Sequence, residues 1–359
     1  MDLPDAIHFV GPLSSTNSLG ISARGFLARF EVASTVASTD WTYGFEQISK
    51  FDLPGCNSSV KENEFDLDVF HINIDMAKNF SREVESLTRS RVRLVLPYWE
   101  LSSFRPEWMG GFKLFDGFIA PTNFIRNAIL PLTKKPVHLL SPLLKNPTPT
   151  NFISRHTLGI SRDAYVFLYI FDVRSGFARK NPTILLRAFE AIQNIIQKDV
   201  HLVLKTSGDL ASSDLFKDFP NVLKNENITL IDNECSESEI ADLYQLSNCY
   251  VSPHRAEGLG LTLIEALRQH CALIYTKYSG SDEIPELPGM MPIEYRMTEI
   301  GRGLDPYQEF NLWAEPDFES LYSSMLSFAV NKTLLSNEAH AWVTEKYFEP
   351  KPKVSISHV

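Results

Sequence analysis

The stretch VSPHRAEGLGLTLIEALRQHCALIYTKYSGSDEI (251–284) decides the fold. It runs from an apolar strand through an acidic, glycine-containing turn into a helix, and then into a second apolar strand. Two strands joined through a helix are parallel neighbours in a sheet that helices cover. The stretch therefore predicts one strand–helix–strand unit of an α/β fold.

The same alternation of strand-length apolar runs and helix-period segments continues along the whole chain. In the first half it predicts strands at 6–11, 68–73, 91–99, 116–122 and 137–141 and helices at 19–31, 76–88 and 122–130. In the second half it predicts strands at 165–172, 200–208, 227–233, 249–254 and 272–278 and helices at 181–198, 238–247 and 260–269. Near-continuous apolar strands of this kind form parallel sheets covered on both faces.

The segment 141–161 breaks this alternation, because it is rich in Pro, Thr and Asn. It is the best candidate for a linker between two doubly wound domains, residues 1–150 and residues 151–334. Such domains bind ligands at the carboxyl ends of their strands. Two of them facing each other would form a cleft, which is the usual place for a ligand.

Composition excludes several classes of protein. The chain has 359 residues, 44% of them hydrophobic and 22% charged, as in ordinary globular proteins. A net charge of −10 argues against a nucleic-acid partner. The four cysteines lack the spacing of metal-binding motifs. The sequence shows neither a signal peptide nor a membrane-spanning segment, so we expect a cytoplasmic protein. Residues 1–150 are close to neutral, which leaves open a peripheral contact with a membrane; the oligomeric state stays open.

The glycine-containing turn has the composition of an anion site. Gly258 and Gly260 bracket a helix start, where free backbone N–H groups and the positive end of the helix dipole favour a phosphate. Glu265 on the helix can accept two hydrogen bonds from the hydroxyls of a ribose, and Glu257 in the loop lies near the reacting sugar. The turn thus predicts a nucleotide-sugar site that includes Gly258, Leu259, Gly260 and Leu261. The alternative is that Glu257 only caps the helix and that Glu265 is only a solvated charge on its surface.

Residues 251–284 also resemble the signature of the retaining glycosyltransferases of family 4. The resemblance lies in the initial Ser-Pro, the Glu-Gly-x-Gly-Leu core and the Glu-Ala pair. It implies a GT-B fold, and transfer of a hexose with retained configuration from a nucleotide-diphosphate sugar to a saccharide or lipid-linked acceptor in polysaccharide or glycoconjugate biosynthesis. It also implies that a C-terminal helix at 335–350 returns to the first domain.

A basic loop follows the first strand of the second domain. Arg174, Arg179 and Lys180 precede a helix, and cations beside a helix N-terminus can hold a diphosphate. The family pattern here is Gly-Arg, four residues, then Lys-Gly. Lys180 matches the lysine, whereas Ser175 occupies the position of the arginine. Either Arg174 or Arg179 would then supply the missing charge, and we expect Lys180, Arg179 and Glu257 to be the catalytic residues. The alternative is that the three cations are solvated loop charges.

Four further residues are candidates for the site. Lys205 ends a strand, and His254 directly precedes the loop of Glu257. Gly20 resembles the family's N-terminal glycine turn, which packs against the donor. Glu100 follows Trp99, where the family often has a His-Asp pair, and is either an acceptor-orienting carboxylate or a cap.

The sequence predicts no metal ion and no cofactor besides the nucleotide-sugar co-substrate. Asp66 and Asp68 form a D-x-D pattern, but a solvated entry into a strand is the favoured interpretation. Two other functions remain as alternatives. The departures at Ser175 and Trp99 fit a sugar-nucleotide-binding protein without turnover, and the fold also serves other GT-B enzymes such as sugar-nucleotide epimerases.

Overall fold

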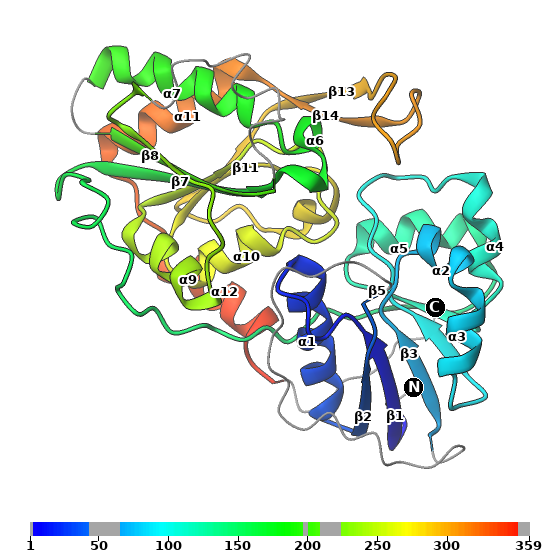
Figure 1. The fold of residues 1–359 in the computed structure, drawn as a ribbon. Helices are drawn as coiled ribbons and strands as arrows, with labels where there is room; N and C mark the ends of the chain where they lie inside the picture. The colour runs from blue at the N-terminus through cyan, green and yellow to red at the C-terminus, as the bar shows by residue number, and fades with distance from the viewer. Residues whose placement is uncertain (1–2, 43–64, 197–199, 209–223, 351–359) are drawn as a thin grey trace. The chain divides into compact units, whose positions relative to one another are not determined.

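The computed structural model describes residues 3–42, 65–196, 200–208 and 224–350, which form two compact units (Figure 1). The first unit comprises the described residues of Met1–Lys145 and Glu345–Val359, and the second comprises those of Asn146–Thr344. The division falls inside the proposed linker, just before the boundary at 150. Helix α12 (Asn337–Tyr347), which overlaps the expected helix at 335–350, carries the chain from the second unit to the first.

The first unit is built on a six-stranded sheet in the order β2-β1-β3-β4-β5-β6, with every neighbouring pair parallel. Its strands are β1 (Ala6–Gly11), β2 (Thr35–Asp40), β3 (Leu67–Phe70), β4 (Arg93–Val95), β5 (Gly117–Ala120) and β6 (Val137–Leu139). Its helices are α1 (Ser18–Glu31), α2 (Ile74–Asn79), α3 (Ser81–Leu87), α4 (Met109–Phe112) and α5 (Asn123–Ile129). A fully buried core of Ile7, Phe9, Phe26, Phe30 and Val69 lies between α1 and the strands.

Three elements of the first unit differ from the prediction. The expected helix at 76–88 is two helices, because the backbone at Phe80 leaves the helical region between α2 and α3. The expected strand at 91–99 is limited to β4, since Pro97 lacks a backbone donor for a sheet ladder. Strand β2 was not predicted, because its sequence TVASTD is polar and only partly buried.

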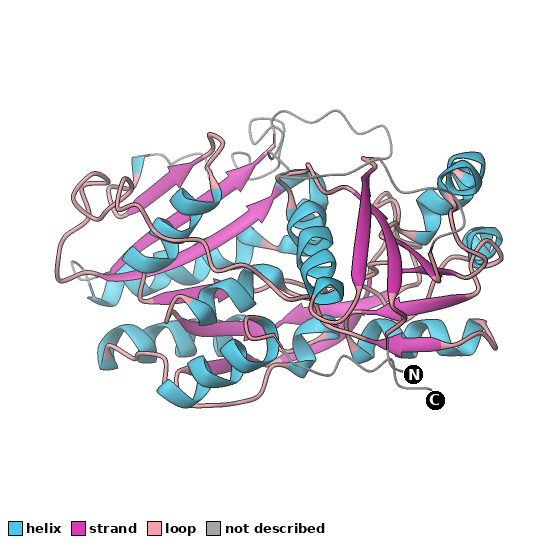
Figure 2. Cartoon of the chain, turned by 90° about the horizontal axis from the view of Figure 1, so that it is seen from below, coloured by secondary structure: helices cyan, strands magenta, loops and turns pink. Residues whose placement is uncertain are grey.

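The second unit also has a parallel six-stranded sheet, in the order β12-β11-β10-β7-β8-β9. Its strands are β7 (Tyr165–Asp172), β8 (Val200–Ser207), β9 (Ile228–Ile231), β10 (Cys249–Ser252), β11 (Ala272–Thr276) and β12 (Met290–Ile293). Its helices are α6 (Phe177–Lys180), α7 (Pro182–Ile196), α9 (Glu237–Leu246), α10 (Leu261–Arg268) and α11 (Phe318–Asn331). In Figure 1, α7 and α11 lie on one side of the strands and α9 and α10 on the other, and Figure 2 shows the helices and strands of the chain from below. An antiparallel hairpin of β13 (Tyr295–Glu299) and β14 (Leu312–Pro316) is an addition that the sequence did not predict.

The order of strands in the second unit determines where a ligand can bind. Renumbered from β7, it is the 3-2-1-4-5-6 order of a dinucleotide-binding fold, so the winding direction reverses between β7 and β10. Loops that leave the carboxyl ends of these two strands diverge at such a switch point and leave a crevice. The two doubly wound sheets confirm the predicted fold class.

The proposed linker contains no helix or strand from Ser141 to Ser161, and its second half is bound firmly to the second unit. The Asp242 carboxylate accepts hydrogen bonds from the backbone N–H groups of Thr150 and Asn151, both at 2.7 Å, and of Ile153 at 3.1 Å. Four fixed donors, the Thr150 hydroxyl included, compensate the burial of this carboxylate.

Two further expectations concern chemistry rather than fold. Cys235, Cys249 and Cys271 are free thiols, whereas Cys56 lies outside the described residues. Within the part of the chain that the structure describes, no helix is long and apolar enough to span a bilayer.

Candidate functional site

The candidate site is formed by segments that follow three neighbouring strands of the second unit. Helix α6 follows β7, the loop 253–260 follows β10, and the short helix η5 (Ser279–Glu283) follows β11. Because β10 pairs with both β7 and β11, the three segments meet at one edge of the sheet. The sheet order therefore brings together residues that are far apart in the sequence.

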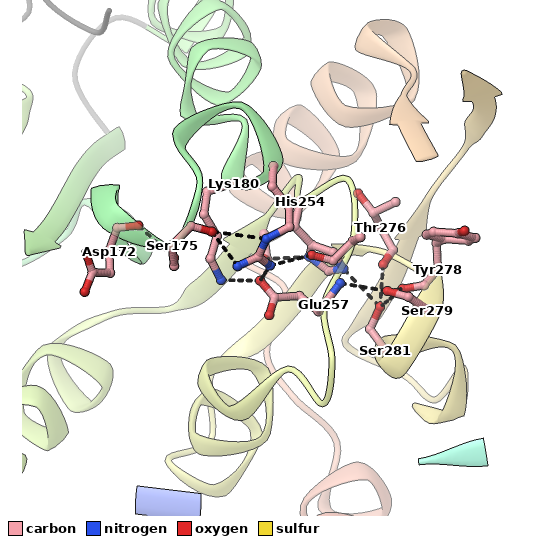
Figure 3. A network of polar contacts seen from close by, with 12 residues as sticks. Asp172, Ser175, Lys180, His254, Glu257, Thr276, Tyr278, Ser279 and Ser281 are labelled. Carbon is pink, nitrogen blue, oxygen red and sulfur yellow. Dashed lines mark hydrogen bonds and ion pairs between the residues drawn. The ribbon is translucent and has the colours of Figure 1, made fainter. Parts of the chain in front are cut away.

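A cluster of two cations and one carboxylate lies at the centre of this edge. The Lys180 ammonium donates to Glu257 Oε1, and Arg179 Nη1 lies 3.3 Å from the same oxygen. All three side chains are largely buried, with exposed fractions of 14% for Lys180, 13% for Glu257 and 5% for Arg179. Figure 3 shows Lys180 and Glu257 pointing toward each other. The structure thus unites all three residues that were expected to be catalytic.

The surroundings of Glu257 keep its carboxyl ionised. Burial alone would raise the pKa of this group, but Lys180 and Arg179 outweigh the burial and hold the pKa at about 2. A carboxylate with this pKa is negative throughout the physiological range. The site therefore contains a fixed negative charge between two fixed positive charges.

The loop of Glu257 is held by the turn Ser279-Gly280-Ser281. The backbone N–H of Glu257 donates to Ser279 Oγ at 2.7 Å, and the N–H of Gly280 donates to the Glu257 carbonyl at 2.7 Å. A Cβ at Gly280 would lie 2.2 Å from the Gly258 carbonyl oxygen, so no larger residue fits. The sequence prediction missed this turn, and the glycine between two serines after an apolar strand was the available signal.

His254 supports the same loop from inside. It is 0% exposed, with Nδ1 2.9 Å from Ser252 Oγ and Nε2 3.0 Å from Ser281 Oγ. Burial lowers the pKa of its imidazole to about 4, so the ring is neutral at pH 7. We expected His254 to contact the donor; in the structure both ring nitrogens are already engaged, and the side chain joins the loop to the turn (Figure 3).

The start of α10 has the features of an anion site. Gly260 adopts a left-handed conformation with φ of 77° and has no side chain with which to cap the helix. Helix N-termini of this kind direct backbone N–H groups toward a bound anion. Leu259 and Leu261 on either side are buried, which fixes the turn against the core. The structure therefore places the predicted phosphate turn directly after the Glu257 loop.

Glu265 lies one turn into α10 and is partly buried. Its Oε2 accepts a hydrogen bond from the Tyr244 hydroxyl at 3.1 Å. Burial raises the pKa of the Glu265 carboxyl to about 7, although the bond from Tyr244 opposes this shift. The residue is partly buried rather than solvated, which removes the alternative that it is an ordinary surface charge.

The remaining basic residues separate into two groups. Arg174 is 58% exposed and forms a two-point pair with Asp172, at 3.0 and 2.8 Å. Lys205 is 2% exposed, burial lowers its pKa, and its ammonium donates to the Thr206 carbonyl at 2.5 Å. Arg179 instead binds the carbonyl oxygen of Ser175 at 2.8 Å and faces Glu257. Of the two arginines left open by the sequence, Arg179 is the one in the cluster.

Two candidates belong to the first unit. Gly20 lies in the first turn of α1, where a Cβ would come within 1.9 Å of the Ser15 carbonyl oxygen, so glycine is required by packing. Glu100 is partly buried at the carboxyl edge of the first sheet. The ring of the preceding Trp99 stacks on that of Phe104, with 5.6 Å between the ring centres. Both lie at loops where a doubly wound sheet binds ligands.

The D-x-D pattern is a structural feature. Asp68 is 0% exposed and binds His8 Nδ1 at 2.8 Å and the N–H groups of Arg89 and Ser90 at 2.8 and 2.6 Å. The expectation of a solvated strand entry is therefore wrong for Asp68, which joins two strands and a loop. Among the described residues no group of three His, Cys, Asp or Glu side chains could hold a metal ion.

Known proteins resemble this chain in one stretch of sequence and in fold. Residues 157–286, which contain Lys180, Glu257 and Glu265, match the family model of the glycosyl transferases group 1. A comparison with curated proteins gave no match. The structure is similar to HepE from Anabaena in complex with UDP and glucose, with a TM-score of 0.66, 12% identity and 96% of each chain covered.

Two other solved structures show the same architecture. Sucrose-phosphate synthase from Thermosynechococcus elongatus matches with a TM-score of 0.67 and 12% identity, over 96% of this chain and 95% of that one. OtsA matches with a TM-score of 0.60 and 9% identity, over 96% and 94%. At such low identities the likeness concerns the fold, which is GT-B: two Rossmann-like α/β domains.

Proposed function

We propose that this protein is a retaining glycosyltransferase that moves a hexose from a nucleotide-diphosphate sugar to a saccharide or lipid-linked saccharide acceptor. The observation that carries the proposal is the contact of Lys180 with Glu257 beside the N-terminus of α10, at the switch point of the second sheet. The match of residues 157–286 and the UDP in the HepE complex support a nucleotide-sugar donor.

The residues of the site have different roles in this proposal, and Glu257 acts at the reacting end of the sugar. The N-terminal amides of α10 and the Lys180 ammonium hold the diphosphate, and Glu265 accepts hydrogen bonds from the ribose hydroxyls. The acceptor oxygen attacks the anomeric carbon from the face of the leaving group as the bond to the diphosphate breaks. The leaving phosphate oxygen takes the acceptor proton, and Lys180 stabilises the negative charge that remains. The products are a glycoside of retained configuration and a nucleoside diphosphate.

We also propose that the reaction needs no divalent metal, because Lys180, Arg179 and backbone amides already supply positive charge at the diphosphate. EDTA should then leave the rate unchanged. Loss of activity in EDTA and its recovery with Mn²⁺ would contradict this part of the proposal.

The function is tested by the release of nucleoside diphosphate from UDP-, GDP-, dTDP- and ADP-hexoses, with and without oligosaccharide and lipid-linked acceptors. A thermal-shift screen selects the base first, since a ligand at 100 times its Kd stabilises the folded protein by about 2.7 kcal/mol. We expect release that depends on an acceptor and a product of retained configuration. A product of inverted configuration would contradict the mechanism.

A nucleotide-sugar-binding protein without turnover is the second candidate. It is favoured by Ser175 at the position of the family arginine and by the engagement of Arg174 with Asp172. Donor binding without release of nucleotide for any acceptor would support it. An epimerase, the third possibility within this fold, would convert the hexose of its donor without an acceptor.

A further inference from the structure

Helix α6 is a single helical turn that carries Arg179 and Lys180. It lies between two residues with positive φ, Gly176 at 100° and Asn181 at 53°, so it is not continuous with other helical segments. One turn makes too few internal hydrogen bonds to be stable by itself. The position of Lys180 must therefore be fixed by contacts that α6 makes with the rest of the unit.

The last carbonyl groups of α6 are bound by residues outside it. The Lys180 carbonyl accepts a hydrogen bond from the Tyr169 hydroxyl at 2.6 Å. The Arg179 carbonyl accepts one from the backbone N–H of Arg255 at 2.7 Å, and the Ala178 carbonyl accepts one from the Arg255 guanidinium. Arg255 thus supplies two of these three bonds, one from its backbone and one from its side chain.

The other side of the Arg255 guanidinium is fixed by β14. Its Nε and Nη2 donate to the two carboxylate oxygens of Glu315, at 2.5 and 2.9 Å. The guanidinium carbon lies 5.2 Å from the centre of the Trp313 ring, and the Ala314 N–H donates to the Arg255 carbonyl at 3.0 Å. This two-point pair needs the planar fork of an arginine, because a lysine is a single point charge.

From this geometry we propose that Arg255 positions Lys180, and that Glu315 holds Arg255 in the orientation that binds α6. The inference rests on the proposed function, in which Lys180 stabilises the leaving diphosphate. Arg255 acts through α6 and not on the reacting atoms, so it is a positioning residue. Through Glu315, strand β14 then takes part in positioning Lys180.

Hydrogen exchange of the protein without any substrate tests the positioning directly. We compare Arg255→Lys and Glu315→Gln with the matched control Arg302→Gln, which breaks another ion pair of the same hairpin. Arg302 is 90% exposed and pairs with Glu309 at 2.6 Å. We expect faster exchange at the Lys180 and Asn181 amides, which bond within α6, in the first two variants. Exchange in β7 and β8 should stay unchanged, and the control should match the wild type.

Turnover provides the second measurement. A displaced Lys180 should lower kcat by about 10- to 100-fold and change the KM for the donor less than kcat, with the control at the wild-type rate. Wild-type exchange at α6 in both variants would overturn the proposal. So would faster exchange throughout the second unit, because that would show a general role in folding.

The two measurements separate this inference from the proposed function. If the wild-type protein turns over no donor at all, the proposed function fails. Exchange then still decides whether Arg255 and Glu315 order α6. Wild-type exchange at α6 in both variants would refute the positioning of α6 by Arg255 and Glu315, whether or not the protein is a transferase.

Discussion

Glu257 and Glu265 lie eight residues apart, on either side of one glycine turn, yet their surroundings move their pKa values in opposite directions. Burial would raise the pKa of Glu257, but the cations of α6 hold it at about 2. Neither Lys180 nor Arg179 is among the causes that shift the pKa of Glu265, and burial raises this pKa to about 7, against the hydrogen bond from Tyr244.

The difference shows that position relative to the sheet, and not residue type, assigns the two roles. Glu257 leaves the carboxyl end of β10 toward α6, where fixed charges meet at the switch point. Glu265 lies further along the chain on α10, where it is partly buried and has Tyr244 as its partner. Carboxyl groups whose environments separate their pKa values commonly do different tasks in one site. We expect the first to act at the sugar and the second at the nucleoside.

The largest effect on kcat should follow removal of Lys180, the cation that pairs with Glu257. Lys180→Ala should lower kcat by about 10²–10³, because a preorganised donor to the leaving charge is lost. Lys277→Ala is the matched control, since Lys277 also pairs with a glutamate of the second unit, Glu286 at 2.7 Å. Steady-state turnover measures the effect, and circular dichroism checks the fold. A folded Lys180→Ala protein with nearly normal kcat would show that other residues hold the diphosphate.

On the other side of the turn, Glu265→Ala should affect binding rather than turnover. The loss of hydrogen bonds to a carboxylate should weaken the binding of the nucleoside diphosphate by about 1.5–3 kcal/mol. Titration calorimetry with the base chosen by the thermal-shift screen measures this. Glu257→Ala serves as the comparison and should lower kcat with a smaller change in Kd. If the two variants exchanged these effects, the assignment of roles would have to be reversed.

The free energy of unfolding should depend on pH in opposite directions through the two carboxyl groups. The pKa of Glu265 is raised in the folded state from 4.5 to about 7. Its stabilising contribution is therefore complete below pH 4.5 and is lost as the pH rises through 7. Glu265→Gln cannot ionise and should therefore be more stable than the wild type at pH 8. We expect a gain of about 1–2 kcal/mol, which is less than the full pKa shift would give, because the side chain is only partly buried. The gain should vanish at pH 4.

Glu257→Gln should behave in the opposite way. The pKa of Glu257 is lowered from 4.5 to about 2, so its contribution is present above pH 4.5 and is lost as the pH falls toward 2. This variant should be less stable than the wild type at pH 7 and approach it in acid. Urea unfolding at several pH values measures both. Parallel curves for the two variants would mean that their environments do not differ as the structure indicates.

The sequence alone predicted most of the strands and the glycine turn at 258–260, because these features depend on local patterns. Buried parallel strands are apolar along their whole length, so β1 and β7 were predicted at their observed bounds. Glycines at a helix start predicted the phosphate turn, and Lys180 was placed by its position after β7. These features need only neighbouring residues, or one strand and the loop that follows it.

The features that sequence missed depend on partners far apart in the chain. Arg255 and Glu315 are separated by 60 residues, as are His8 and Asp68, and neither pair has a local signal. The engagement of His254 by Ser281 was equally hidden, since only the folded β11 turn brings the serine to the ring. The polar edge strand β2 carried too little apolar pattern to be recognised.

The smallest effect should come from the arginine that lies outside the cluster. Arg174 is 58% exposed and engaged with Asp172, and exposed ion pairs contribute about 0.2–1 kcal/mol. Arg174→Ala should therefore change kcat by less than about fivefold. Arg179→Ala should cost more, because this buried guanidinium binds the carbonyl groups of Ser175 and Ala256 and faces Glu257. A larger loss of kcat in Arg174→Ala than in Arg179→Ala would show that Arg174 leaves Asp172 to meet the diphosphate. Arg174 would then supply the positive charge of the family arginine, whose position Ser175 occupies.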